Sequence, residues 1–164
     1  EILVSLKFSP RLLVWIAILT IIISPTHVHL AFALGLIACE LSVFILKALA
    51  KTVLGKDNRT GKRPKVPLCG CGVYCEDKAR HDSSYGLPSG HSTIAAFAAV
   101  FWSLQIKGTK YAELKMGIFA TLALAVMASR VYIGCHSVLQ VIIGGILGAS
   151  IAVGADALTQ QTWF

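Results

Sequence analysis

Apolar residues recur along the chain in five long runs, and short polar segments separate them. An apolar run with few charges is a candidate transmembrane helix when it approaches about 20 residues, the length that crosses the hydrocarbon core. The first run is shorter than this, and Arg11 and Ser24 extend it as polar ends at the membrane surface. The pattern predicts five membrane-spanning helices, at about 12–23, 28–49, 89–106, 114–130 and 136–158.

One long polar segment, residues 47–87, interrupts this alternation. It carries most of the lysines and arginines and has neither helical nor strand periodicity. A polar loop of this length in a small membrane protein is more often functional than idle. With five crossings, this loop lies on the same membrane face as the start of the third span, the end of the fourth and the start of the fifth. We therefore expect the functional residues to gather at that face.

The composition supports a membrane protein. Hydrophobic residues make up 55% of the chain, and the mean hydropathy of +0.72 is high for a soluble fold. The net charge of +7 is compatible with nucleic acid, but the cations stand between the spans and form no aromatic-interleaved basic face. We predict an all-α, polytopic helical membrane protein with a single membrane-embedded domain over residues 1–164. Its expected partners are the bilayer and anionic head groups or phosphates, not nucleic acid, and its oligomeric state stays open.

Two features within the spans carry further expectations. Glu40 lies in the middle of the second run, where an acid is costly, so we expect it to face the bundle interior as a protonated or hydrogen-bonded structural residue. A substrate role is the alternative, and Glu40 is also the one feature that would suit a small channel or transporter. Gly144 and Gly148 form a G-x-x-x-G motif, which favours close helix packing.

Three of the five cysteines crowd into residues 69–75. A zinc site with His81 as fourth ligand, a disulfide and free thiols all remain open, although paired zinc-binding cysteines usually stand further apart. The five are Cys39, Cys69, Cys71, Cys75 and Cys135.

Three short polar motifs fall on the expected functional face. They read K-x6-R-P at 56–64, P-S-G-H at 88–91, and S-R-x5-H-x3-Q at 129–140. The first is cationic, the second can begin a helix, and the third joins the fourth span to the fifth. Their candidate functional residues are, in chain order, Lys56, Arg63, Ser89, Gly90, His91, Arg130, His136 and Gln140.

These residue types suit phosphoryl transfer. A phosphate ester is anionic and its transition state spreads charge over the equatorial oxygens, so Lys56, Arg63 and Arg130 can supply a fixed positive field. The hydroxyl of Ser89 and the backbone N–H of Gly90 can complete an oxygen cradle at a helix N-terminus. This chemistry calls for no metal and no cofactor, and we predict neither.

The two histidines of the motifs, His91 and His136, can divide the remaining work. One would act as a nucleophile that forms a phosphohistidine, and the other as a general acid for the leaving group. The sequence alone does not decide between them.

The three motifs together resemble the signature of the type-2 phosphatidic acid phosphatase family, K-x6-R-P, P-S-G-H and S-R-x5-H-x3-D. The resemblance covers about residues 56–140 and departs only at the last position, where Gln140 stands in place of the acid. It implies a metal-independent integral membrane lipid phosphatase with His136 as nucleophile and His91 as general acid. In the family the acid orients the nucleophilic ring; Gln140 can accept the same N–H but brings no negative charge.

Residues 129–141 also look like the third motif of the dolichyl diphosphatase branch, which has glutamine at this place, whereas Gly90 departs from that branch's more common serine. The resemblance implies a polyprenyl diphosphate such as dolichyl diphosphate as the leading substrate, with phosphatidate or another lipid phosphate as runner-up. A catalytically weak membrane scaffold that retains the fold is the alternative from another class.

The membrane orientation receives conflicting signals. The cations of the 47–87 loop would place the site in the cytoplasm by the positive-inside rule, whereas the dolichyl diphosphatase resemblance implies the endoplasmic reticulum with a lumenal site. We expect a lumenal site, because cations selected for phosphate binding weaken that rule. The chain begins at Glu1 rather than at methionine, so we expect some N-terminal sequence to be missing, and the family usually has a sixth span.

Overall fold

The computed structural model describes residues 9–55, 58–64 and 85–161. The described part is helical, and its β pairing is limited to an antiparallel bridge between Lys62 and Tyr85. The predicted all-α architecture is confirmed, and so are the five helices. Lys56, Cys69, Cys71, Cys75 and His81 lie outside the described residues. The helices are α2 (Ser9–Ile23), α3 (His27–Leu54), α5 (Gly90–Gln105), α6 (Ala112–Tyr132) and α7 (Val138–Gln161).

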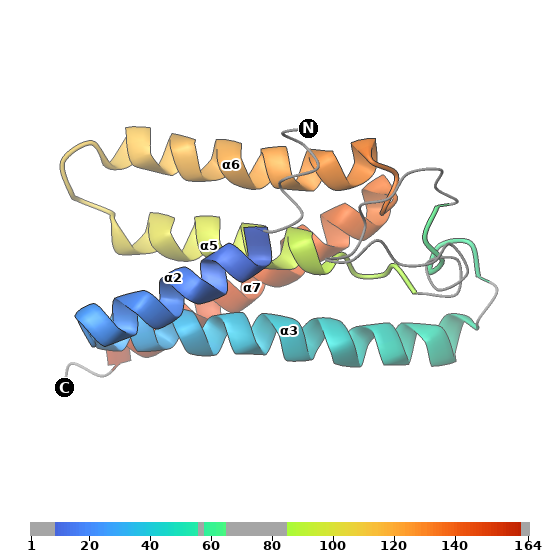
Figure 1. The fold of residues 1–164 in the computed structure, drawn as a ribbon, viewed down its shortest axis with the longest axis horizontal. Coiled ribbons are helices and arrows are strands. Elements are labelled where there is room, and N and C mark those ends of the chain that lie inside the picture. The colour runs from blue at the N-terminus through green and yellow to red at the C-terminus, as the bar shows by residue number, and fades with distance from the viewer. Residues whose placement is uncertain (1–8, 56–57, 65–84, 162–164) are drawn as a thin grey trace.

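Helix α5 is the centre of the bundle, since it packs against each of the other four helices. The helices lie along the long axis of the molecule, and the turn between α5 and α6 stands at one end (Figure 1). At the other end the segments 58–64 and 85–89 meet the end of α3, the start of α5 and the loop between α6 and α7 (Figure 1). The predicted gathering of the motifs at one face is confirmed for the described residues, and we call this end the motif end.

Helix α3 is longer than predicted at its C-terminal end. It continues to Leu54, whereas the apolar pattern places the end of the span near residue 49. Lys47 therefore lies inside the helix, one turn after the buried Val43, and not at the start of a loop. The prediction that the polar loop begins at residue 47 was wrong, because the helix continues beyond the apolar run.

Glycines let α7 approach α5 closely. A Cβ atom on Gly144 would lie 2.5 Å from the carbonyl oxygen of Ser89, and one on Gly148 would clash with the backbone of Thr93. Any side chain at these two positions would push α7 away from the first turns of α5. The predicted packing role of the G-x-x-x-G motif is therefore confirmed.

An aromatic cluster fills the core toward the opposite end, which we call the aromatic end. Phe32 on α3 stacks on Phe97 of α5 with ring centroids 5.5 Å apart, and its ring lies 5.5 Å from Phe101 and 5.2 Å from Trp102. Phe97 and Phe101 are fully buried. These contacts fix α3 against α5 by van der Waals packing, with no polar group in the cluster except the Trp102 indole.

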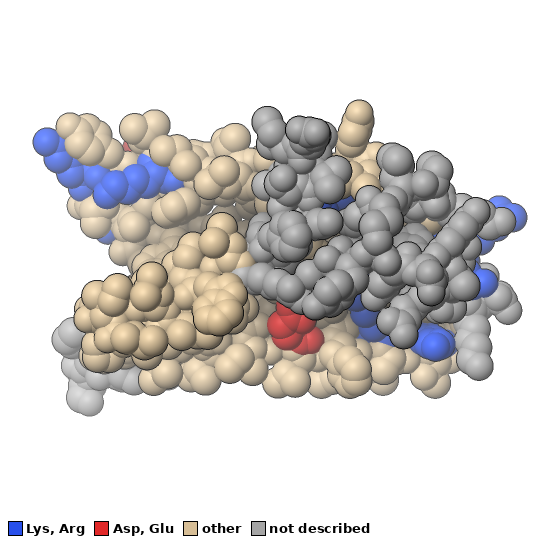
Figure 2. All heavy atoms as spheres, viewed as in Figure 1, with Lys and Arg blue, Asp and Glu red and all other residues tan. Residues whose placement is uncertain are grey.

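Large hydrophobic side chains cover the outside of the bundle, as a bilayer-embedded protein requires. On α3, for example, Phe44 is 73% exposed and Val53 is 79% exposed. Helices α3, α6 and α7 are long and apolar enough to cross a membrane, whereas α2 and α5 have 15 and 16 residues. On the face shown in Figure 2, the visible Lys and Arg lie toward the two ends of the long axis, and an acidic residue lies near the middle. The protein is an integral membrane protein.

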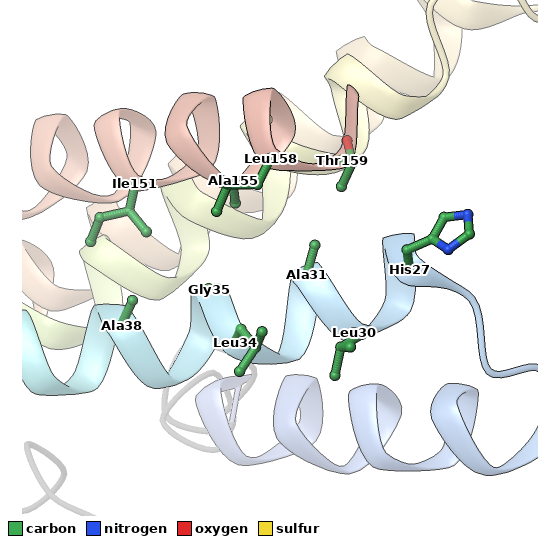
Figure 3. Close-up of a pocket in the computed structure, with 10 residues that line it drawn as sticks. All are labelled: His27, Leu30, Ala31, Leu34, Gly35, Ala38, Ile151, Ala155, Leu158 and Thr159. Atoms are coloured by element: carbon green, nitrogen blue, oxygen red, sulfur yellow. The ribbon is translucent and has the colours of Figure 1, made fainter. Parts of the chain in front are cut away.

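Within the described part of the chain, two apolar grooves lie between helices. One, of about 480 Å³, lies between α2, α5 and α6. The other, of about 400 Å³, lies between α3 and α7, where Ala31 and Ala38 face Ile151 and Ala155 (Figure 3). His27 and Thr159 stand together at one end of this second groove (Figure 3). We call them the α5–α6 groove and the α3–α7 groove.

The prediction that Glu40 faces the bundle interior was wrong, because its side chain is exposed. The buried stripe of α3 includes Leu36, Cys39 and Val43, which recur at helical spacing, and Glu40 stands next to this stripe on the outer surface. A channel lined by Glu40 has no support from this position.

Candidate active site

His136 lies in the short connection between α6 and α7 and is almost fully buried, with 3% of its surface exposed. Its backbone N–H donates to the carbonyl oxygen of Arg130 at 3.2 Å, as does that of Cys135 at 3.0 Å. Gly134 adopts a positive φ of 78°, which glycine tolerates and which turns the chain at the end of α6. These bonds fold the connection back on α6 and hold His136 against Arg130.

One ring nitrogen of His136 is held by two acceptors. Its Nδ1 lies 2.9 Å from the carbonyl oxygen of Gly86 and 3.2 Å from Oε1 of Gln140. Because both partners are oxygens that accept, Nδ1 carries the proton, and in the neutral ring the lone pair is on Nε2. This is the tautomer that a nucleophilic or basic Nε2 requires.

The surroundings of His136 favour its neutral form. Burial, the positive charges of Arg63 and Lys47 and, to a smaller degree, the charge of His91 lower the pKa of His136 well below its ordinary value of 6.5, and the hydrogen bond with Gln140 opposes this. The cations named here come from the 58–64 segment and from α3, so residues far apart in the chain act on one ring.

Gln140 lies in the first turn of α7 and forms part of a capping box. Its backbone N–H donates to Oγ of Ser137 at 3.3 Å, and its Oε1 accepts the Ser137 N–H at 3.3 Å. This reciprocal pair is what an S-x-x-Q sequence forms at a helix start. Its Nε2 donates to the carbonyl oxygens of Thr60 at 2.9 Å and of Lys62 at 2.8 Å. Gln140 is fully buried, so its carboxamide meets protein groups on all sides.

The segment 58–64 carries Arg63 and is tied to residues 85–86 as well as to Gln140. The Gly86 N–H donates to the carbonyl oxygen of Gly61 at 2.7 Å, and a Cβ atom on Gly61 would clash with the ring of Tyr85. A Cβ atom on Gly86 would lie 3.0 Å from Cγ of Arg63. The Arg63 side chain therefore lies beside Gly86, whose carbonyl holds His136.

The second motif forms the start of α5, as predicted, but the details differ. Pro88 lies two residues before the helix, after a cis Leu87–Pro88 peptide bond, so it is not the first helical residue. Ser89 is the N-cap residue and is fully buried; its Oγ accepts from Ser92 at 2.9 Å, and its N–H donates to the Gln140 carbonyl at 3.1 Å. The phosphate-binding roles of Ser89 and Gly90 stay predictions.

Arg130 on α6 and His91 on α5 both act on His136, the first through its backbone carbonyl and the second through its charge. Arg130 is fully buried in the last turn of α6, and its Nε donates to Oγ of Ser129 at 3.1 Å. His91 is partly exposed in the first turn of α5. Burying a guanidinium in this position is costly unless an anion or hydrogen bonds compensate it, which fits a site for phosphate.

Sequence reasoning missed Lys47. The lysine is partly buried, and its charge acts on His136 together with that of Arg63. Val43, one turn earlier on α3, would lie 3.6 Å from a Cβ atom on Gly90, so this face of α3 meets the start of α5. The signal that could have revealed it is a lysine one helical turn after Val43, at the end of the apolar run.

Cys135, next to His136, is disulfide-bonded, whereas Cys39 is a free thiol buried in α3. The three alternatives for residues 69–75 concern positions outside the described part of the chain.

The arrangement combines a buried histidine of defined tautomer, several cations and a helix N-terminus at one end of a membrane bundle, which are the elements of a phosphoryl-transfer site. A family model described as the PAP2 superfamily matches residues 13–163. No curated protein and no solved structure matches the chain. Members of this family are phosphatases, and the match supports action on lipid phosphates. The chain belongs to the PAP2 superfamily.

Proposed function

We propose that this protein is a metal-independent phosphatase that removes the terminal phosphate of a polyprenyl diphosphate, such as dolichyl diphosphate, through a phosphohistidine on His136. The observation that carries the proposal is the hydrogen bonding of His136: Nδ1 is held by Gly86 and Gln140, so Nε2 is the nucleophilic atom. Its lowered pKa keeps the ring neutral at neutral pH. A phosphatidate or more general lipid phosphatase is the runner-up.

In the first step, Nε2 of His136 attacks the terminal phosphorus and the bond from phosphorus to the lipid-side oxygen breaks. His91 donates its proton to that oxygen, and the lipid monophosphate leaves. In the second step, water gives a proton to His91 and attacks the phosphohistidine. The P–N bond breaks, inorganic phosphate is released and His136 returns to its neutral state.

The cations around His136 support the charge balance of this reaction. Arg130, Arg63 and Lys47 come from three different segments, and the charges of the last two already act on His136 without substrate. A diphosphate carries more negative charge than a monoester, so three converging cations suit it. Lys56, outside the described residues, is proposed as a further phosphate-binding residue.

The α5–α6 groove offers a place for the lipid tail. Its lining residues on α5 include Ala95 and Ala98, at i+4 and i+7 from His91, and those on α6 include Val126 and Ala123, at i−4 and i−7 from Arg130. Both rows therefore continue the helix faces that carry the two site residues, and the groove begins about one helical turn, ~5.4 Å, from each. We propose that the tail lies there while the phosphates reach the site.

A pair of α6 variants tests the tail site. Ala125 is exposed and lines the groove, whereas Ala120 is exposed on the same helix outside it. We expect Ala125→Trp to raise KM for a long-chain substrate by at least about tenfold through displacement of the tail, and to leave a short-chain phosphate unaffected. Ala120→Trp should change neither. Equal effects of the two variants, or an equal loss with the short-chain phosphate, would contradict the tail site.

The dolichyl diphosphatase branch is supported by Gln140 and by the S-R-V-Y run that begins at Ser129. The departure at Gly90 has no steric cause, because a Cβ atom there would have only an ordinary 3.6 Å contact with Val43. Glycine and serine therefore both fit at this position.

The disulfide at Cys135 supports a site on the lumenal side of the endoplasmic reticulum. Disulfides persist in oxidising compartments and are rare in the cytosol. Cys135 precedes His136, so its surroundings and the site share one membrane face. Sealed vesicles and a membrane-impermeant reagent test this orientation, through labelling of residues on the membrane face that carries His136. Labelling of these residues from the cytosolic side alone would contradict it.

Phosphate release by the purified protein in detergent with EDTA present tests the function. We expect release from dolichyl diphosphate in preference to phosphatidate, and a labelled phosphohistidine that is trapped on wild type and absent from His136→Ala. Preference for phosphatidate would favour the runner-up. A well-folded preparation that releases phosphate from neither lipid would support the catalytically weak scaffold.

A further inference from the structure

Gln140 performs two tasks with the two halves of one side chain. Its Oε1 contacts Nδ1 of His136 and closes the capping box with Ser137. Its Nε2 makes two further hydrogen bonds, to the carbonyl oxygens of Thr60 and Lys62, which lie in the segment that carries Arg63. Because both partners of this nitrogen are carbonyl oxygens, it must be the NH2 group of the amide.

We propose that Gln140 is a positioning residue that couples the Arg63 segment to the nucleophile, and that this coupling requires a carboxamide and excludes a carboxylate. The inference rests on the proposed function for its kinetic consequences. It explains why glutamine stands where the signature of the family has an acid: the acid can serve the histidine, but it has no proton for two backbone carbonyls.

A carboxylate at this position would preserve one set of contacts and destroy the other. Glutamate is as long as glutamine, accepts from His136 and is equally suited to the capping box with Ser137. Toward Thr60 and Lys62, however, it would present an unprotonated oxygen to two carbonyl oxygens, which can only accept. Both hydrogen bonds would be lost, and the like partial charges would repel.

The packing around Gly86 shows that this coupling acts at the centre of the site. A Cβ atom on Gly86 would lie 2.5 Å from Oε1 of Gln140 and 3.0 Å from Cγ of Arg63. The Gly86 carbonyl accepts from His136 at 2.9 Å. The Arg63 segment, residue 86 and the start of α7 therefore meet with no spare space, and release of the segment would move Arg63 relative to His136.

Gln140→Glu tests the coupling with two independent readouts. The first is tryptic cleavage after Arg59 or Lys62 in the folded protein, which we expect to become about tenfold faster because two hydrogen bonds that hold the segment are gone. The second is a split of the kinetic constants: KM should rise about tenfold as Arg63 loses its position, while kcat changes less than about threefold because His136 keeps its acceptors.

The control is Gln160→Glu, the same chemical change at an exposed position of α7, which should alter neither readout. If Gln140→Glu does not fold, Gln140→Met removes both donors without burying a charge and should still accelerate cleavage and raise KM. Wild-type cleavage together with wild-type or improved KM in the variant that folds would overturn the proposal. Cleavage is measured without substrate, so it tests the coupling even if the proposed phosphatase activity fails.

Discussion

The two ends of α5 are held together by different kinds of interaction. At the motif end, Ser89, Arg130 and Gln140 are fully buried. Hydrogen bonds there join distant parts of the chain, from the Ser89 N–H to the Gln140 carbonyl and from Nε2 of Gln140 to the Thr60 carbonyl. At the aromatic end, Phe97 and Phe101 pack against Phe32, and a hydrogen bond from Nε2 of Gln105 to Oδ1 of Asp156 at 2.7 Å joins α5 to α7. The first end depends on the identity of each atom, and the second mainly on volume and shape. The comparison predicts that the two ends can be damaged separately.

The largest difference between the two ends is expected when a histidine at each end is replaced by alanine. His136→Ala removes the proposed nucleophile and should lower phosphate release by at least about 10⁴-fold, because no other group replaces Nε2. His27→Ala changes an exposed histidine at the other end of the bundle and should leave release unchanged. Release is measured on preparations with matched helical circular dichroism. Substantial turnover by His136→Ala would remove this residue from the nucleophile role.

A core substitution should show the reverse behaviour. Phe97→Ala opens a cavity beside Phe32 and Phe101, and the cavity alone should lower the free energy of unfolding by about 2 kcal/mol. The water-transfer contribution is largely absent, since lipid is as apolar as the core. Thermal unfolding in detergent measures the loss, and Phe97→Leu should restore most of it. The rate per folded molecule should stay near that of wild type; a collapse of that rate would mean that the two ends are not independent.

The same contrast explains what the sequence predicts and what it does not. Five apolar runs predict five helices. Two motifs share a membrane face when an even number of crossings separates them, so the gathering of the motifs at one end follows from the pattern. The Ser137 and Gln140 spacing is also readable as a capping box. Side-chain direction is less accessible: Glu40 lies beside the buried stripe of α3, and a single helical step separates interior from lipid.

The partners of the Gln140 amide could not be predicted. Thr60 and Lys62 contribute backbone carbonyls, which every residue has, and they lie far from Gln140 in the sequence. The role of Gly86 is similar, since only its carbonyl and its lack of a side chain matter. Lys47 escaped notice because it falls where the predicted span 28–49 and the predicted loop 47–87 overlap, and it was counted among the cations of the loop. Motifs therefore indicate the candidate reacting groups, whereas the residues that support them depend on tertiary structure.

The smallest expected effect is a change in the pH dependence of activity, and it concerns residues within the motif end. Burial and the charge of Arg63 lower the pKa of His136, so the neutral nucleophile persists below pH 6.5. Removal of that charge in Arg63→Gln should raise the pKa of His136, and the acid limb of kcat/KM should move to higher pH. The shift is measured as kcat/KM for one soluble phosphate ester over a range of pH. Because each variant is assayed with the same ester, ionisation of the substrate affects all of them equally.

Arg59→Gln is the matched control, since Arg59 is exposed in the same segment and its charge is not among those that lower the pKa of His136. This variant loses the same charge and should leave the acid limb in place.

The lowered pKa of His136 also predicts how the stability of the fold depends on pH. A histidine whose pKa is lower in the folded state than in the unfolded state favours folding at pH values above its unfolded pKa, and this contribution is lost as the pH falls below about 6.5. Arg63→Gln should reduce that loss. An acid limb and a stability profile that coincide in Arg63→Gln and Arg59→Gln would mean that Arg63 does not act on His136, and the argument for a cation-surrounded nucleophile would then rest on Arg130 and Lys47.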